Sequence, residues 1–334
     1  MDAQVTGRVE PGWEPVRAVF EASFAAGAEI GAALSVRHRG QVVVELAGGF
    51  ADPGAGRGWT QDTPSVCFSS TKGLVATCFL IAQDRGQIDL DSPVADVWPE
   101  FGTADKSRVT PRMILNHRAG LSALDAPLLV THVRDDPERV ERALLDQVPT
   151  WEPGADQAYA ACVFGLYAQA MFRRATGATL GAYLAEHVTG PLGLDAECAL
   201  GRPQQLGVQP ARLFPVPPRT VLSSVVPTAL FRDTPDGRMF RRILAGPRTL
   251  AGRATLNPSL GPDRLHALND PALHRMELPW MNAITSARAL ARVYAALAGD
   301  GSVDGVRLVR PERLAPLHGR QSWSERDHTL QKPV

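Results

Sequence analysis

The chain has 334 residues, enough for one large domain or two ordinary ones with a sizeable core. Its 35 basic and 35 acidic residues give a formal net charge of +0, which argues against a nucleic acid or a membrane surface held by bulk charge. Residues 1–6 lack the basic and apolar regions of a signal peptide, and no apolar run reaches the length of a membrane span. We therefore expect a cytoplasmic protein.

The first 60 residues predict a helix followed by a hairpin. Apolar residues recur at helical spacing across 13–30, and two β-rich runs at 32–38 and 41–46 flank a glycine turn. We expect the glycine-rich stretch 48–58 to lead out into a loop. This order predicts the edge of an α/β layer and not the start of a Rossmann domain.

The most apolar stretch is the run 74–82, which follows a Ser-x-x-Lys sequence formed by Ser69 and Lys72. A helix that is apolar on all sides belongs in the middle of a domain. Ser69 or Ser70 can serve as its N-terminal cap, and Gly86 suits a left-handed C-terminal cap.

Residues three apart on a helix share a face, so Ser69 and Lys72 can point into one space. A serine hydroxyl becomes a good nucleophile when a base takes its proton, and a desolvated lysine with a lowered pKa can be that base. A chain of this length contains roughly one Ser-x-x-Lys by chance. However, lysine occurs only at positions 72, 106 and 332. Because arginine cannot be deprotonated, retention of this lysine favours a catalytic amine.

Further helices are predicted downstream. Thr110 and Pro111 are a typical cap and first residue of a helix, and others are expected at 136–148, from Tyr159 to Thr176, and at 286–298. The stretch 202–279 is rich in proline and glycine and lacks periodicity, so we expect a mostly irregular excursion that lines a pocket.

Two groups of residues have structural interpretations. Asp89 and Asp91 are expected to make turns and caps, and the arginines at 232–242 and 310–313 to be solvated surface. The cysteines lie in or beside apolar helical stretches without metal-ligand spacing, which predicts reduced thiols and neither a metal nor a cofactor; they are Cys67, Cys78, Cys162 and Cys198. A Cys-His enzyme built on Cys67 is the weaker alternative, since only the helix end would lower that thiol's pKa.

Taken together, these motifs resemble the serine β-lactamase and penicillin-binding-protein superfamily, and in particular its class-C-like branch of esterases, β-lactamases and related hydrolases. The resemblance spans nearly the whole chain. Its carriers, in the family's order, are Phe68-Ser69-Ser70-Thr71-Lys72, residues 86–94, residues 115–121, Trp151-Glu152-Pro153-Gly154 and residues 190–194.

The resemblance implies a role for each matching residue. Ser69 would be the acylated nucleophile, Lys72 its partner amine, and Tyr159 the tyrosine of the second motif, which relays a proton to the leaving group. Ala161 stands where many members have asparagine, so an amide contact to the substrate is not expected. His117 matches a family position that we interpret as a hydrogen-bonded scaffold rather than a base.

The implied fold is α/β (α+β) and β-lactamase/transpeptidase-like, with an antiparallel sheet flanked by helices and a mostly helical domain. We expect residues 1–66 and 280–334 to form the α/β domain and 67–279 the helical domain. The family's third motif, Lys or His followed by x-Gly on a late strand, has no match there, because His38-Arg39-Gly40 lies in the first hairpin. The family continues with three strands and a closing helix, so we expect the α/β domain to be incomplete at its C-terminal end.

The expected function is that of a serine hydrolase that forms an acyl-enzyme on small esters, with β-lactams as a second substrate class. The expected partner is a small-molecule ester or amide, with no nucleic acid and no membrane, and the oligomeric state is not indicated. The alternative is a truncated or non-catalytic scaffold member of the same family.

Overall fold

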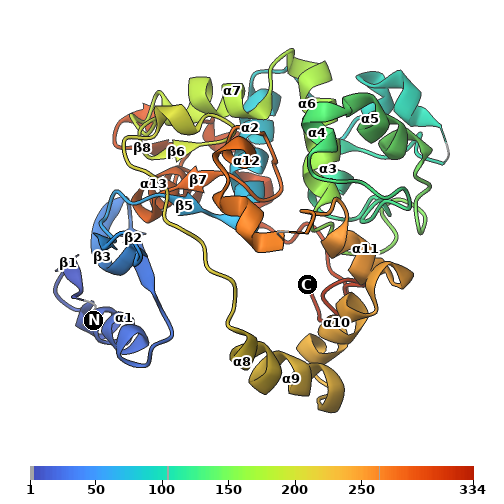
Figure 1. Ribbon diagram of the computed structural model, residues 1–334. Helices are drawn as coiled ribbons and strands as arrows, with labels where there is room; N and C mark the ends of the chain where they lie inside the picture. The colour runs from blue at the N-terminus through green and yellow to red at the C-terminus, as the bar shows by residue number, and fades with distance from the viewer. Residues whose placement is uncertain (1–3, 104, 263) are drawn as a thin grey trace.

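The computed structural model describes residues 4–103, 105–262 and 264–334. Helix α2 (Thr71–Asp84) lies at its centre, with α6 (Val163–Thr176) and α7 (Leu180–Leu184) beside it (Figure 1). Ten of the fourteen residues of α2 are buried, which confirms the prediction of a central helix. The core around α2 consists of aromatic and aliphatic side chains, such as Phe79 of α2 and Phe172 of α6, whose rings meet edge to face.

The ends of α2 were predicted with mixed success. Gly86 follows the last turn with φ +72°, as expected of a left-handed cap. The prediction of a serine cap is wrong, because Ser70 stands at the cap position without a side-chain hydrogen bond. Instead, a 3₁₀ turn, η1 (Phe68–Ser70), leads directly into the helix. The serine side chains are therefore left available for other contacts.

The N-terminal sheet contains the predicted hairpin. Strands β2 (Gly31–His38) and β3 (Gln41–Asp52) pair antiparallel, β1 (Thr6–Val9) adds to the other edge of β3, and β4 (Arg57–Gly58) pairs with its end. The prediction of a loop from residue 48 is wrong, because β3 continues to Asp52.

Helix α1 (Glu14–Ala25) confirms the first predicted helix. Two glycines of β3 leave room for a side chain of this helix. A side chain at Gly48 would lie 3.3 Å from the ring of Phe24, and one at Gly49, which has φ +74°, only 2.8 Å from it. Strand β3 therefore carries no side chain where Phe24 of α1 packs against it. No residue of α1 is fully buried.

A second, small sheet positions the start of α2. Strands β5 (Ser65–Val66) and β6 (Cys198–Ala199) both pair with β7 (Ile284–Thr285). Beyond the sheet, the backbone N–H of Cys67 donates to the carbonyl of Ala283, whose own N–H donates to the Thr71 hydroxyl. The turn that carries Ser69 is thus fixed to a segment more than 200 residues away in sequence.

The stretch 202–279 is more regular than predicted. Polar side chains cap three of its helices, α10 (Pro235–Leu244), α11 (Leu250–Leu256) and α12 (Pro271–His274). The prediction of an irregular stretch rested on its weak periodicity, whereas Thr234-Pro235 and Asp270-Pro271 are start signals for two of these helices. Two further helices are α8 (Pro218–Thr220) and α9 (Val226–Phe231).

In Figure 1 helices α8–α11 form an arm below the main body, and the C-terminus lies beside α10 and α11. The guanidinium of Arg238 on α10 donates to the Gln331 carbonyl at 3.4 Å, which joins the arm to the chain's last residues.

The other predicted helices are confirmed, with side-chain caps at Thr110, Asp136 and Ser286. They are α3 (Pro111–Leu115), α5 (Pro137–Asp146) and α13 (Ala287–Ala298). The remaining α-helices and strands are α4 (His132–Asp135), α14 (Ala315–His318), β8 (Ser302–Val303) and β9 (Val306–Arg307).

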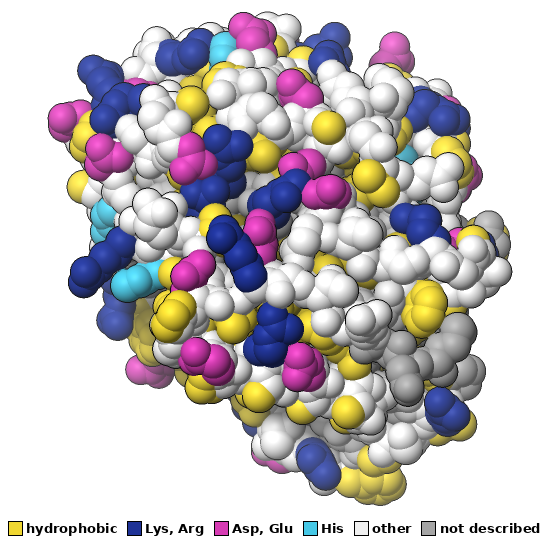
Figure 2. All heavy atoms as spheres, turned by 90° about the vertical axis from the view of Figure 1, so that its left-hand side faces the viewer, with side chains coloured by type: hydrophobic (Ala, Val, Ile, Leu, Met, Phe, Trp, Pro, Cys, Tyr) yellow, Lys and Arg dark blue, Asp and Glu magenta, His cyan; other side chains and the backbone are white. Residues whose placement is uncertain are grey.

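The balanced charge of the sequence is visible on the surface. Figure 2 shows the face that carries the N-terminal sheet, where acidic and basic side chains are interleaved. Asp304, for example, pairs with Arg37 of β2 at 3.1 Å and with Arg292 of α13 at 2.7 Å. Among the described residues, no helix is both long and apolar enough to cross a membrane.

Packing around Gly165 gives a first testable prediction. A Cβ at this position of α6 would lie 2.7 Å from both the backbone nitrogen and the Cε3 atom of Trp280. We expect Gly165→Ala to lower the free energy of unfolding by about 1–3 kcal/mol, because the backbone of 279–280 must move. Chemical denaturation measures this. Gly54→Ala is the control, since its nearest neighbour is Asp52 Oδ1 at 3.4 Å; equal losses in the two variants would contradict the packing argument.

Candidate active site

Ser69 lies on the exposed turn η1 at the mouth of α2. The preceding residue, Phe68, has φ +45°, an uncommon conformation for a residue with a side chain. This sharp turn leaves the Ser69 hydroxyl accessible to solvent while its backbone is fixed by the β5 connection.

Two side chains converge on the Ser69 oxygen. Lys72 Nζ donates to Ser69 Oγ at 3.2 Å from one turn along α2, and the Tyr159 hydroxyl donates to the same atom at 2.6 Å from 90 residues away. The structure thus brings together all three residues that the sequence singled out. A serine oxygen between an amine and a phenol is positioned to exchange a proton with either.

The amine of Lys72 is buried and held by backbone carbonyls. Besides Ser69, it donates to the carbonyl of Ala161 at 2.8 Å and to that of Trp280 at 3.0 Å. The amine also lies 5.1 Å from the centre of the Tyr159 ring. Burial lowers the pKa of Lys72 to about 8, partly opposed by Cys162. A substantial fraction of this lysine is therefore neutral near pH 8.

The sequence predicted Tyr159 at the start of a helix, but the structure places it four residues before α6. The ring of His117 packs edge-to-face against the ring of Tyr159, with the two ring centres 4.9 Å apart. His117 Nδ1 accepts the N–H of Ala160 at 3.2 Å. Burial raises the pKa of Tyr159, an effect that the hydrogen bond with Ser69 opposes.

The surroundings of His117 agree with the scaffold interpretation. Burial, aided by the nearby Lys72 charge, lowers the pKa of His117 to about 3, so its ring is neutral at physiological pH. His117 has φ +61°, and its carbonyl accepts the N–H of Ala158 at 3.2 Å, which fixes the segment that leads to Tyr159. Asp89 makes the predicted turn, since it accepts the N–H of Asp91 at 3.0 Å, whereas Asp91 forms a bidentate ion pair with Arg112.

The carbonyls of Ala161 and Trp280 are the parts of the site that the sequence did not reveal. Every residue carries a carbonyl, so no residue type marks the ones that will meet an amine. Trp280 follows Pro279 at the end of the long excursion, and only folding brings it beside α2.

The chain is similar to known proteins along nearly its whole length. The family model described as Beta-lactamase matches residues 16–331. The esterase/beta-lactamase LipL of Mycobacterium tuberculosis is 32% identical over 336 residues, which cover 99% of this chain and 73% of LipL.

Two solved structures are similar along 99% of the chain and 81% of their own. One is a family VIII carboxylesterase, with a TM-score of 0.80 and 30% identity. The other is a penicillin-binding protein homologue from Caulobacter crescentus, with a TM-score of 0.79 and 29% identity.

The protein is accordingly a serine hydrolase with the β-lactamase/transpeptidase-like fold that the sequence predicted. Within that class, the chain belongs to the beta-lactamase family.

Proposed function

We propose that this protein hydrolyses small carboxylic esters through an acyl-enzyme on Ser69. The observation that carries the proposal is the pair of hydrogen bonds that Lys72 and Tyr159 donate to one exposed serine oxygen. Nucleophile and base within hydrogen-bond reach, with the base itself held in place, is the arrangement that covalent catalysis requires.

In the proposed acylation, neutral Lys72 takes the Ser69 proton as Oγ attacks the ester carbonyl carbon. The tetrahedral intermediate then collapses, the C–O bond to the alcohol breaks, and the Tyr159 hydroxyl gives its proton to the departing oxygen. The Lys72 ammonium restores the tyrosine proton. In the second half of the reaction, water takes the place of Ser69 as nucleophile and gives its proton to Lys72. The bond to Ser69 Oγ then breaks, Tyr159 returns a proton to this oxygen, and the acid is released. Lysine is the better base in the free enzyme, because burial lowers its pKa and raises that of the phenol.

The backbone N–H of Ser69 is the proposed first donor to the oxyanion. In the described part of the chain it donates to no acceptor, and it lies at the N-terminal end of α2, where the helix dipole favours negative charge.

Esters are preferred over β-lactams in this proposal because of Ala161. The side chain at this position is a methyl group, which has no donor or acceptor to hold the amide of a β-lactam acyl group. The names of the relatives, an esterase/beta-lactamase and a family VIII carboxylesterase, support ester chemistry. We also propose that the partner is a small ester or amide rather than a nucleic acid or a membrane, and that the protein acts in the cytoplasm, where its four free cysteines stay reduced.

A fluorophosphonate probe tests the nucleophile directly. We expect mass spectrometry to locate the adduct on Ser69 alone, and p-nitrophenyl butyrate to be turned over faster than nitrocefin. An unlabelled protein with a native melting curve would support the non-catalytic alternative. Label on Cys67 would instead point to a thiol enzyme.

The pH dependence of turnover follows from the lysine. At a pKa of about 8, roughly a tenth of Lys72 is neutral at pH 7 and half at pH 8. We expect kcat/KM for p-nitrophenyl butyrate to rise through pH 8 and to level off above it. No limb is expected near pH 6.5, because His117 remains neutral there. A rising limb centred near 6.5 would assign the base to a histidine.

A further inference from the structure

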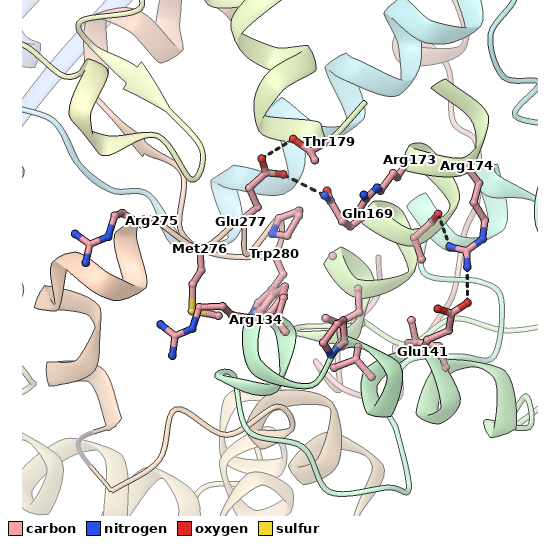
Figure 3. Close-up of a pocket in the computed structure, with 18 of the residues that line it drawn as sticks. Arg134, Glu141, Gln169, Arg173, Arg174, Thr179, Arg275, Met276, Glu277 and Trp280 are labelled. Carbon is pink, nitrogen blue, oxygen red and sulfur yellow. Dashed lines mark hydrogen bonds and ion pairs between the residues drawn. The ribbon is translucent and has the colours of Figure 1, made fainter. Parts of the chain in front are cut away.

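A cavity that Ser69 does not line lies beside helix α6. It has a volume of about 460 Å³, within the range of small-molecule sites. Figure 3 shows it between α5, α6 and the segment that follows α12. Its lining recurs at helical spacing along one face of α5 and one face of α6, so the two helices form its walls.

The inner wall of this cavity is apolar. Buried side chains form it, namely Val140, Leu144, Leu166, Met276 and Trp280. Ala170 of α6 lies among them with a side chain that leaves the space open. Such a wall favours a hydrocarbon chain, because burying each methylene group removes apolar surface from water.

The rim of the cavity carries an excess of positive charge. Four arginines line it against two glutamates. The glutamates have partners already: Glu141 pairs with Arg174, and Glu277 accepts hydrogen bonds from Thr179, Gln169 and the N–H of Gly181, two of which are drawn in Figure 3.

Two of the four arginines also have partners. Arg174 pairs with Glu141, and Arg134 is engaged by Asp135 at 2.6 Å. In the described part of the chain, Arg173 and Arg275 donate no side-chain hydrogen bond and form no ion pair. Arg173 is the better placed of these two, since it follows Gln169 by one helical turn on the face of α6 that lines the cavity. An exposed guanidinium above an apolar wall matches a molecule with a carboxylate head and an apolar tail.

The cavity and the candidate active site share one residue. The ring of Trp280 forms part of the cavity wall, and its carbonyl accepts the Lys72 amine at 3.0 Å. Gly165 packs directly against the backbone of Trp280. A molecule that shifts Trp280 from the cavity side therefore acts on the hydrogen bond that positions Lys72.

We propose that this cavity is a second ligand site, which binds a carboxylate with an apolar chain and transmits its occupancy to Lys72 through Trp280. The acid released by ester hydrolysis has this chemistry, so the site gives the enzyme a means of sensing its product. The effect on turnover rests on the proposed function, whereas the binding does not.

Calorimetric titration with decanoate tests the binding in protein that carries Ser69→Ala and cannot turn over. We expect saturable binding that Arg173→Gln weakens about tenfold, as the loss of one charged contact does. Ala170→Phe, which fills the cavity, should abolish binding, and unchanged melting temperatures should show that both variants fold. Arg142→Gln is the matched control, because Arg142 lies on α5 but does not line the cavity. Decanol should bind more weakly than decanoate.

Binding that survives both Ala170→Phe and Arg173→Gln would place decanoate elsewhere, including at Ser69, and would overturn the site; so would the absence of binding. In the active protein, decanoate should change kcat, and Ala170→Phe should remove that change. Decanoate binding without any effect on kcat would overturn the link to Lys72. Failure of the fluorophosphonate to label Ser69 would contradict the proposed function separately, since the titration does not depend on it.

Discussion

Replacing Ser69 by alanine should abolish ester hydrolysis, with kcat falling by roughly 10⁴-fold or more, because no other group can form the covalent intermediate. The side chain is exposed and, among the residues that the structure describes, has no hydrogen-bond partner beyond Lys72 and Tyr159, so the variant should melt close to the parent temperature. Turnover of p-nitrophenyl butyrate and labelling by a fluorophosphonate measure the loss.

Ser70→Ala is the matched control for this experiment. Ser70 is adjacent in sequence and equally exposed, but it makes no side-chain hydrogen bond that caps α2. We expect it to retain turnover within a few-fold. Full activity in Ser69→Ala would end the acyl-enzyme proposal, and equal losses in the two variants would leave the helix mouth, rather than one hydroxyl, as the feature that matters.

Lys72→Arg should be nearly as damaging as Lys72→Ala, with kcat lowered by about 10²–10⁴-fold in both. Arginine keeps the positive charge but cannot release its proton, so the substitution separates the base role from charge alone. Its larger head must also fit between the carbonyls of Ala161 and Trp280. Steady-state kinetics on the folded fraction, with the pH profile of any residual activity, provide the measurement.

Lys106→Arg supplies the control for burial. Lys106 is also fully buried and donates to carbonyls at the end of α5, including that of Gln147 at 3.0 Å. No serine is among its hydrogen-bond partners in the described part of the chain. We expect this variant to lose stability while the folded protein keeps its kcat. Substantial activity in Lys72→Arg would make Lys72 an electrostatic group and would assign the base to Tyr159.

The comparison of these two lysines shows how far sequence reasoning reaches. Scarcity of lysine favoured a catalytic amine at Lys72, but it does not separate Lys72 from Lys106, because both are buried and bonded to carbonyls. What separated them in the sequence was the serine three residues before Lys72. That spacing is local, and a helix converts it into contact without help from the rest of the fold.

Local signals likewise predicted most of the secondary structure. The apolar run of α2, the caps Thr110 and Ser286 and the hairpin turn at Gly40 are all decided by neighbours within a few residues. The loop expected from residue 48 was wrong for a tertiary reason. Gly48 and Gly49 are there to admit Phe24, and this requirement outweighs the low strand propensity of glycine.

By itself, the sequence determined the central helix and the Ser69–Lys72 pair, because these depend on periodicity or on spacing over one turn, and it indicated the class of fold through the resemblance of its motifs to a known family. Only the tertiary structure decided that Tyr159 reaches the serine oxygen, that Trp280 and Ala161 hold the amine, and that His117 supports the phenol. These contacts join residues about 40 to 208 positions apart, and they form when chain segments pack together around α2. The lowered pKa of Lys72 is a consequence of the same packing, since desolvation exists only once the core has closed over the amine.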